Sequence, residues 1–247
     1  MTPDISYAVR TLLEARRGGL QVAPPFALPD RSAVYAIQDG VAEASGPVAG
    51  WKVGARTPAA EPNPAPLLAG ALVPSPATFD GKAMHMIGIE VEISFHIAAD
   101  IAARASPVGR EEALAAVGDA FVGMEIVDTR LANFQQLDPE WLLADNQMNH
   151  ALVVGGSIRN WKGLDWAKLQ VKLVVDGKTI VDQAGGLGAV DPVRPLAWMI
   201  DHGVRERGGI RKGQAITTGS WTGLRYFPEG SRAQGEFVGL GAVEASF

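Results

Sequence analysis

Apolar and polar residues alternate strictly between residues 88 and 97, in the run GIEVEISFHI. The odd positions from 89 to 97 are large and apolar, and the even positions from 90 to 96 are polar. A period of two is typical of a β-strand with one buried face, so Glu90 and Glu92 share the other face with Cα atoms about 7 Å apart. That polar face is either simply solvated or, because two like charges at this distance repel, a place where a cation binds.

A second apolar run, residues 120–128, predicts another strand and contains Glu125 within the sequence MEIVD. A lone carboxylate among apolar residues is costly, so Glu125 needs a partner. Arg130 is one candidate for that partner. A hard divalent ion such as Mg²⁺ or Mn²⁺ is the other, because three carboxylates on stiff strands supply the all-oxygen donors that it prefers. The residues alone leave both alternatives open.

The remaining pattern predicts helices, a hairpin and closing strands. Residues 57–76 contain six prolines among large apolar residues and are expected to form an ordered loop. Regular βαβ alternation is missing, so the expected class is α+β with mixed or antiparallel sheets. The expected helices are 4–17 (between Thr2-Pro3 and Gly18-Gly19), 30–44 with Asp30 as N-cap, 110–119, and a stretch from Asp191-Pro192 to Gly208-Gly209. The expected strands include the hairpin 169–175 and 178–181 around Asp176-Gly177, followed by 213–218 and 234–247.

The composition is that of a folded protein, with 47% hydrophobic and 20% charged residues in 247. We expect a single catalytic domain over 1–247, with an N-terminal helical portion (1–48) and a β-rich core (49–247). A net charge of −5 without a basic run argues against nucleic acid as a partner. No apolar stretch approaches the ~18 residues that span a membrane. Without a secretory signal the cytoplasm is the expected compartment. Cysteine is absent, which excludes thiolate chemistry.

Three further runs carry residues that could take part in chemistry. Lys52 lies between Gly50 and Gly54, where the backbone can approach a ligand or another strand closely. Lys52 is then either a partly buried lysine with a carboxylate partner or an edge-strand lysine in water. Lys52 and Arg130 are the cations available for an anionic substrate. Asp145-Asn146 and Thr218-Gly219-Ser220 could each be ordinary turns, although the second could also present N–H groups and hydroxyls to an anion.

The order of these runs resembles that of the 2-keto-4-pentenoate hydratases and 4-oxalocrotonate decarboxylases, which belong to the fumarylacetoacetate hydrolase superfamily. The resemblance covers roughly residues 5–247 and is densest from residue 50 onward. The runs are GWKVG (50–54), IEVEISF (89–95), MEIVDTR (124–130), ADN (144–146), LAW (196–198), TGS (218–220) and GAVEASF (241–247).

The resemblance implies a β-rich, mixed-sheet core of the fumarylacetoacetate hydrolase C-terminal-domain type behind an N-terminal helical portion. It also implies Mg²⁺ or Mn²⁺ held by Glu90, Glu92 and Glu125, with Lys52 near a small 2-oxo acid substrate. The expected reaction is that of a hydro-lyase in aromatic compound catabolism, which adds water to a short 2-hydroxy-2,4-dienoate. Alternatives on the same metal are a 4-oxalocrotonate-type decarboxylase and an acylpyruvate C–C hydrolase. We further expect a homo-oligomer, or pairing with a related enzyme subunit.

One departure from the family pattern concerns proton transfer. Related hydratases usually carry an acid within the run that corresponds to residues 67–72, whereas residues 69–71 here are Ala-Gly-Ala. We therefore expect Asp145 or a metal-bound water to take that role beside Lys52. The expected substrate-binding residues are Lys52, Arg130, Thr218, Gly219 and Ser220. The missing acid also leaves open a non-catalytic relative that acts as a partner subunit.

Overall fold

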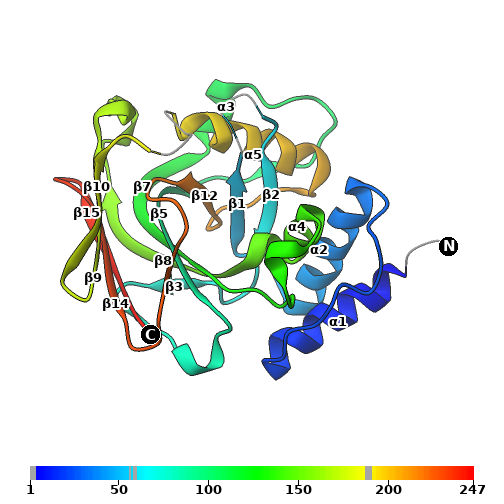
Figure 1. Ribbon diagram of the computed structural model, residues 1–247. Coiled ribbons are helices and arrows are strands. Elements are labelled where there is room, and N and C mark those ends of the chain that lie inside the picture. The colour runs from blue at the N-terminus through cyan, green and yellow to red at the C-terminus, as the bar shows by residue number, and fades with distance from the viewer. Residues whose placement is uncertain (1–3, 56, 58–59, 187–190) are drawn as a thin grey trace.

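Two packed β-sheets form the body of the protein, and helices α1 and α2 lie at the opposite end from the smaller sheet (Figure 1). The computed structural model describes residues 4–55, 57, 60–186 and 191–247; Thr2 and Pro3, the expected start of the first helix, lie outside these ranges. The helices are α1 (Ile5–Gly18), α2 (Arg31–Ser45), α3 (Arg110–Ala115), α4 (Pro139–Ala144) and α5 (Val193–Glu206).

The larger sheet has the strand order β2-β1-β12-β5-β7-β8-β3, with β13 also paired to β5. Most neighbours are antiparallel, but β1 pairs with β12 and β3 with β8 in parallel. The sheet is therefore mixed, as expected. Its strands are β1 (Gly50–Gly54), β2 (Asn63–Leu67), β3 (Leu72–Pro74), β5 (Ile87–Ile97), β7 (Val117–Val127), β8 (Asn149–Ile158), β12 (Ala215–Ser220) and β13 (Arg225–Phe227).

The smaller sheet has the order β10-β9-β14-β15-β4 and packs on the larger one through β14 and β15. The predicted hairpin forms its outer edge: Asp176 and Gly177 have φ angles of 49° and 75°, the left-handed values that a type I′ turn requires. The strands of the smaller sheet are β4 (Ala77–Thr78), β9 (Gln170–Val175), β10 (Lys178–Ala184), β14 (Arg232–Phe237) and β15 (Gly241–Ser246). A separate pair is formed by β6 (Ile101–Ala102) and β11 (Gly209–Ile210).

Helices α1, α2 and α4 enclose a small apolar core of their own, which includes Leu12, Ile37 and Trp141. Asp4 caps α1 by accepting a hydrogen bond from the Tyr7 amide, and Gly19 ends the helix with a φ of 65°. Asp30 caps α2 in the same way, as predicted. Because α4 comes from the middle of the chain, the helical layer is tied to segments that also reach the site described below.

Two expectations about local structure are wrong. Residues 57–76 contain strands β2 and β3 rather than only a loop. Both are edge strands of the larger sheet, where proline is tolerated because its missing N–H interrupts no ladder on the open side. The helix expected over 110–119 ends at Ala115, and β7 begins at Val117.

Strand β5 has the predicted alternation, but its polar face is largely buried, with only Glu90 and His96 partly exposed. Glu92 is 2% exposed and Ser94 is fully buried, although the opposite face already packs into the main apolar core through residues such as Val91 and Ile93. Both faces of β5 are thus largely covered. Among the described residues, no helix is long and apolar enough to cross a membrane.

Candidate metal centre

Three carboxylates from two neighbouring strands converge on one point. Glu90 and Glu92 come from β5 and Glu125 from β7, and each offers a carboxylate oxygen within 4.8 Å of those of the other two. The antiparallel register places Glu90 directly opposite Glu125 and Glu92 opposite Gly123. The sheet therefore brings together the three residues that the sequence predicted.

Glu125 has the most demanding environment of the three. It is fully buried, and its Oε1 accepts hydrogen bonds from Lys52 Nζ at 2.5 Å and from Asn149 Nδ2 at 2.9 Å. Its Oε2 is also buried but has no hydrogen-bond partner in the part of the chain that is described. The expected alternative, a Glu125–Arg130 pair, is wrong because Arg130 pairs elsewhere. An orphaned carboxylate oxygen at the meeting point of three carboxylates fits a metal ligand.

Glu92 is held in place by strand β12. Its Oε2 accepts hydrogen bonds from the Thr217 hydroxyl and, at 3.0 Å, from the Gly219 amide. The opposing position needs glycine, because a Cβ on Gly123 would lie 2.4 Å from Ser94 Oγ. The carboxylate is thus oriented by fixed donors, as expected of a residue positioned to bind an ion.

Burial and mutual repulsion make it costly for all three carboxylates to be charged together. Burial, followed by the nearby charge of Glu125, raises the pKa of Glu90 to about 7, and burial with Glu125 and Glu90 raises the pKa of Glu92 to about 8. Burial disfavours the charged form of Lys52, but the three glutamates outweigh it and raise the lysine's pKa. One ammonium does not balance three carboxylates, whereas a divalent cation would. The all-oxygen donor set suits Mg²⁺ or Mn²⁺.

The cluster lines a cavity of about 660 Å³ that is open to solvent. Lys52 reaches it because β1 runs parallel to β12, with Lys52 beside Thr217. A Cβ on Gly50 would lie 2.1 Å from the Ala215 carbonyl oxygen, so this glycine permits β1 and β12 to approach closely. A Cβ on Gly54 would meet nothing within 4 Å. The other walls include the apolar residues Val53, Pro62, Pro139, Leu142, Leu143 and Pro195.

Thr218, Gly219 and Ser220 also line this cavity, at the end of β12. The Gly219 amide is already used by Glu92, and the Thr218 hydroxyl donates to the Ile93 carbonyl at 2.8 Å. The hydroxyl of Ser220 is buried near Glu90. These residues therefore orient the carboxylates and the strand, and their expected contact with substrate stays a prediction.

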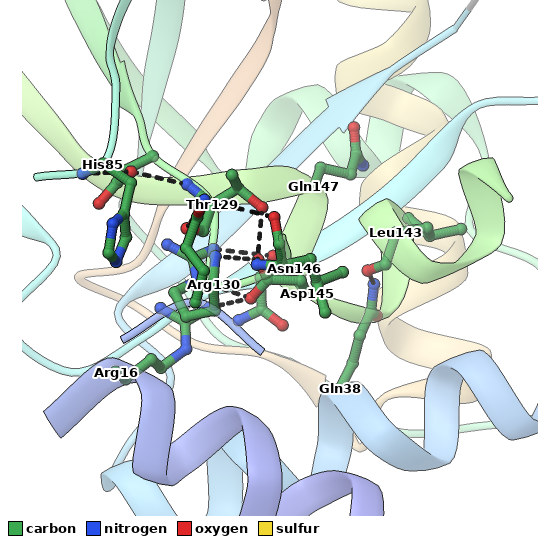
Figure 2. A network of polar contacts seen from close by, with 12 residues as sticks. Arg16, Gln38, His85, Thr129, Arg130, Leu143, Asp145, Asn146 and Gln147 are labelled. Carbon is green, nitrogen blue, oxygen red and sulfur yellow. Dashed lines mark hydrogen bonds and ion pairs between the residues drawn. The ribbon is translucent and has the colours of Figure 1, made fainter. Parts of the chain in front are cut away.

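Asp145 and Arg130 are not part of the cavity wall. Asp145 is fully buried, and Figure 2 shows its carboxylate between two guanidinium groups. Its Oδ1 accepts from Arg130 Nε at 2.7 Å and from Arg16 Nη2 at 3.1 Å. Its Oδ2 accepts from the Arg130 amide at 3.0 Å. The expected direct roles, Asp145 in proton transfer and Arg130 in substrate binding, do not fit this geometry because both side chains are occupied with each other behind the wall.

The turn that follows Asp145 does reach the cavity. Asn146, Gln147 and Met148 have φ angles of 52°, 51° and 60°, so three consecutive residues other than glycine adopt the left-handed conformation. Such residues cost about 1–3 kcal/mol each and persist only where the surroundings hold them. The Gln147 carbonyl accepts a hydrogen bond from Lys52 Nζ at 3.1 Å. Backbone strain therefore lies next to the lysine of the site.

The run without an acid, residues 67–72, lies elsewhere. Ala69, Gly70 and Ala71 line a second cavity of about 260 Å³, together with Arg16 and His150. An acid in place of Ala69, Gly70 or Ala71 would face that second cavity, so its absence takes nothing from the surroundings of Lys52. The absence of an acid at residues 69–71 therefore no longer favours a non-catalytic protein.

Sequence reasoning missed two residues of the site. Asn149, the first residue of β8, donates to Glu125, and Arg194 of α5 brings a second cation to the cavity wall. An asparagine at the start of a strand is also common in turns, and Arg194 lies on a polar face of an amphipathic helix, so neither had a distinctive signal.

No protein-family model matches the chain. Solved structures with the same fold include a putative fumarylacetoacetate hydrolase family protein from Yersinia pestis CO92, which is 15% identical over 81% of this chain and 92% of its own, with a TM-score of 0.58. The 4-oxalocrotonate decarboxylase from Pseudomonas putida G7, complexed with magnesium and adipate, is 22% identical, covers 100% of this chain and 99% of its own, and has a TM-score of 0.81. The fumarylpyruvate hydrolase from Pseudomonas aeruginosa, in complex with Mn²⁺ and pyruvate, is 17% identical over 81% of this chain and 75% of its own, with a TM-score of 0.57. The predicted α+β fold is confirmed by these similarities.

Proposed function

We propose that this protein is an enzyme of the fumarylacetoacetate hydrolase superfamily that depends on a divalent metal ion. The observation that carries the proposal is the cluster of Glu90, Glu92 and Glu125, with one orphaned oxygen and one adjacent ammonium, at a cavity open to solvent. These three side chains would hold Mg²⁺ or Mn²⁺. Solved proteins of the same fold are complexed with magnesium, calcium or Mn²⁺, which supports the choice of ion.

The proposed substrate is a short unsaturated 2-oxo acid. A bound divalent ion supplies a Lewis acid that stabilises negative charge on oxygens of such a substrate. The three glutamates, Lys52 and a divalent ion together are neutral, so the site can accept an anion. In this proposal Lys52 would hold the substrate carboxylate or donate a proton; both Lys52 and Arg194 line the cavity.

Decarboxylation of the 4-oxalocrotonate type is the reaction that we favour. The carbon–carbon bond to the departing carboxylate breaks and CO₂ leaves. The electron pair of the broken bond passes through the conjugated chain to the oxygen of the 2-oxo group. The similarity to 4-oxalocrotonate decarboxylase, which extends over the whole chain, supports this reaction. The apolar walls formed by Pro139 and Leu142 also favour decarboxylation. An apolar environment is less favourable for a charged carboxylate than for the neutral CO₂ that is formed from it.

The hydratase reaction expected from the sequence is the second candidate. It uses the same metal and lysine but must add a proton and a hydroxide from water across a double bond. Among the described residues of the cavity wall, Asp191 is the one carboxylate outside the cluster, and it lies 3.4 Å from Arg110. The site thus offers little for that step besides Lys52, which is why we place this activity second.

One experiment separates these activities. Purified protein is incubated with 4-oxalocrotonate or with 2-hydroxypenta-2,4-dienoate, in Mn²⁺ or in EDTA, while CO₂ and dienol absorbance are followed. Metal-dependent release of CO₂ supports the decarboxylase, and loss of dienol without CO₂ indicates the hydratase. No turnover with the metal bound would leave a non-catalytic relative. Self-association, or pairing with a related subunit, stays a prediction.

A further inference from the structure

A continuous series of contacts runs from the N-terminal helix to the lysine of the proposed active site. Arg16 of α1 binds the buried carboxylate of Asp145, and Asp145 directly precedes the left-handed turn 146–148. The Gln147 carbonyl in that turn accepts a hydrogen bond from Lys52 Nζ. Figure 2 shows Arg16, Arg130 and Asp145 in contact beside Asn146. No residue between Arg16 and Gln147 in this series touches the cavity.

The turn needs the contacts that surround it, because glutamine and methionine do not favour its backbone conformation. Asp145 is fixed at both ends: its carboxylate binds two arginines, and its carbonyl accepts from Arg130 Nη2 at 3.0 Å and from the Met148 amide at 2.9 Å. The side chains of Asn146 and Gln147 donate to the carbonyls of Pro66 and Asn63 at 3.2 and 2.6 Å. The turn is therefore held on both sides.

The turn matters for Lys52 because a lysine side chain is flexible and its ammonium has three equivalent donors. Glu125 accepts one of these and the Gln147 carbonyl accepts a second. Two fixed acceptors determine where the third N–H points. A displaced turn would remove one acceptor, and the ammonium could then rotate about its contact with Glu125.

We propose that Asp145, held between Arg130 and Arg16, is a positioning residue that maintains the 146–148 turn and thereby directs the Lys52 ammonium towards the bound 2-oxo acid. This inference rests on the proposed function for its substrate. It gives the N-terminal helix α1 a part in catalysis, although α1 is separated from the three glutamates by the turn. A displacement of about 1 Å at a reacting group can lower a rate about 100-fold.

The test compares variants that weaken the series at different points. Arg16→Met removes the partly exposed outer ion pair, Arg16→Lys keeps its charge, and Asp145→Asn weakens the buried centre. The matched control is Asp39→Asn, which removes a different ion pair that links α2 to Arg207 of the body. Turnover of 4-oxalocrotonate is measured well below each variant's Tm, Mn²⁺ affinity is measured by calorimetry, and the Arg16→Met protein is crystallised.

We expect kcat to fall about tenfold in Arg16→Met and further in Asp145→Asn, with KM and Mn²⁺ affinity within twofold of wild type. Arg16→Lys should recover most of kcat, and Asp39→Asn should leave it unchanged. In the crystal, the Lys52 Nζ to Gln147 oxygen distance should exceed the hydrogen-bond range of about 3.2 Å. An unchanged turn in Arg16→Met, unchanged kcat in Arg16→Met, or equal losses of kcat and metal affinity would overturn the proposal. If Asp145→Asn does not fold, Arg16→Met and Arg16→Lys still decide.

A failure of the proposed function can be distinguished from a failure of this inference. If wild-type protein with bound Mn²⁺ turns over neither 4-oxalocrotonate nor the dienol, the assigned reaction is wrong. The crystallographic comparison still decides whether Arg16 and Asp145 hold the turn against Lys52.

Discussion

Glu90 and Glu125 lie directly opposite each other on antiparallel strands β5 and β7, so their carboxylates point to the same side of the sheet. Like charges in facing positions destabilise a sheet, and here burial adds to the cost. Lys52 relieves part of the repulsion through its contact with Glu125. We therefore expect the stability of the protein to depend on pH and on metal.

The first prediction concerns stability in EDTA. The pKa values of Glu90 and Glu92 are raised from 4.5 to about 7 and about 8, so between about pH 4.5 and 8 the folded state binds more protons than the unfolded state. The free energy of unfolding should therefore fall as pH rises through this window, by up to about 1.4 kcal/mol per pH unit for each group. With Mn²⁺ the decrease should disappear, because the ion binds the charged carboxylates. Denaturant unfolding at several pH values measures this.

Other groups titrate in part of the same window, so the control for that experiment is a variant. Burial and the charge of Arg207 lower the pKa of His202 to about 4, which makes stability rise with pH between about 4 and 6.5. Glu92→Gln leaves His202 unchanged and removes one of the two carboxyls. If the free energy of unfolding changed with pH by the same slope in the wild type and in Glu92→Gln, both in EDTA, the first prediction would be contradicted.

The second prediction concerns metal affinity. Glu92→Gln should weaken Mn²⁺ binding at least 100-fold, because one charged ligand is lost, while the fold and the Tm in EDTA are retained or improved. Calorimetric titration and circular dichroism measure these quantities. Glu111→Gln, on the exposed surface of α3, is the control. An unchanged stoichiometry and affinity in Glu92→Gln would mean that the ion binds elsewhere.

The third prediction separates Lys52 from the metal ligands. Lys52→Ala should lower kcat at least 100-fold, as expected when a group that transfers a proton or orients the substrate is lost. Mn²⁺ affinity should change only a few-fold, because the three carboxylates remain. Steady-state kinetics and calorimetry on the same preparation decide between these effects. Equal kinetics in the wild type and the variant would refute the role of Lys52.

The fourth prediction distinguishes the two glycines that flank Lys52. Gly50→Ala should lower stability by about 1–3 kcal/mol, because its Cβ would meet the backbone of Ala215 on β12. Gly54→Ala should cost less than about 1 kcal/mol, since the space there is open. Thermal unfolding of the two variants provides the comparison. Equal losses would contradict the close packing of β1 against β12.

Local patterns were sufficient to predict the strand with Glu90 and Glu92, the hairpin at Asp176-Gly177 and the helix capped by Asp30, because each depends on neighbouring residues. Strand β2 was missed because Pro64 and Pro66 argue against a strand unless it lies at a sheet edge. Edge position depends on the tertiary arrangement, which a local pattern does not contain.

The site shows the same division. The three glutamates and Lys52 were predicted to come together and they do. Asp145 was expected beside them as a replacement for the acid missing at 69–71, and Arg130 as a cation available for an anionic substrate. Their side chains bind each other behind the cavity wall, and the left-handed turn that follows Asp145 is one that Gln147 and Met148 give no local reason to expect.

The parallel pairing of Lys52 with Thr217 has a consequence for synthesis. As the chain leaves the ribosome, the strand that carries the lysine emerges long before its partner, with most of the protein still untranslated. The nascent protein therefore cannot complete the proposed site until β12 is free to fold, and shortened products ending before residue 215 should lack the proposed activity however well their helices form.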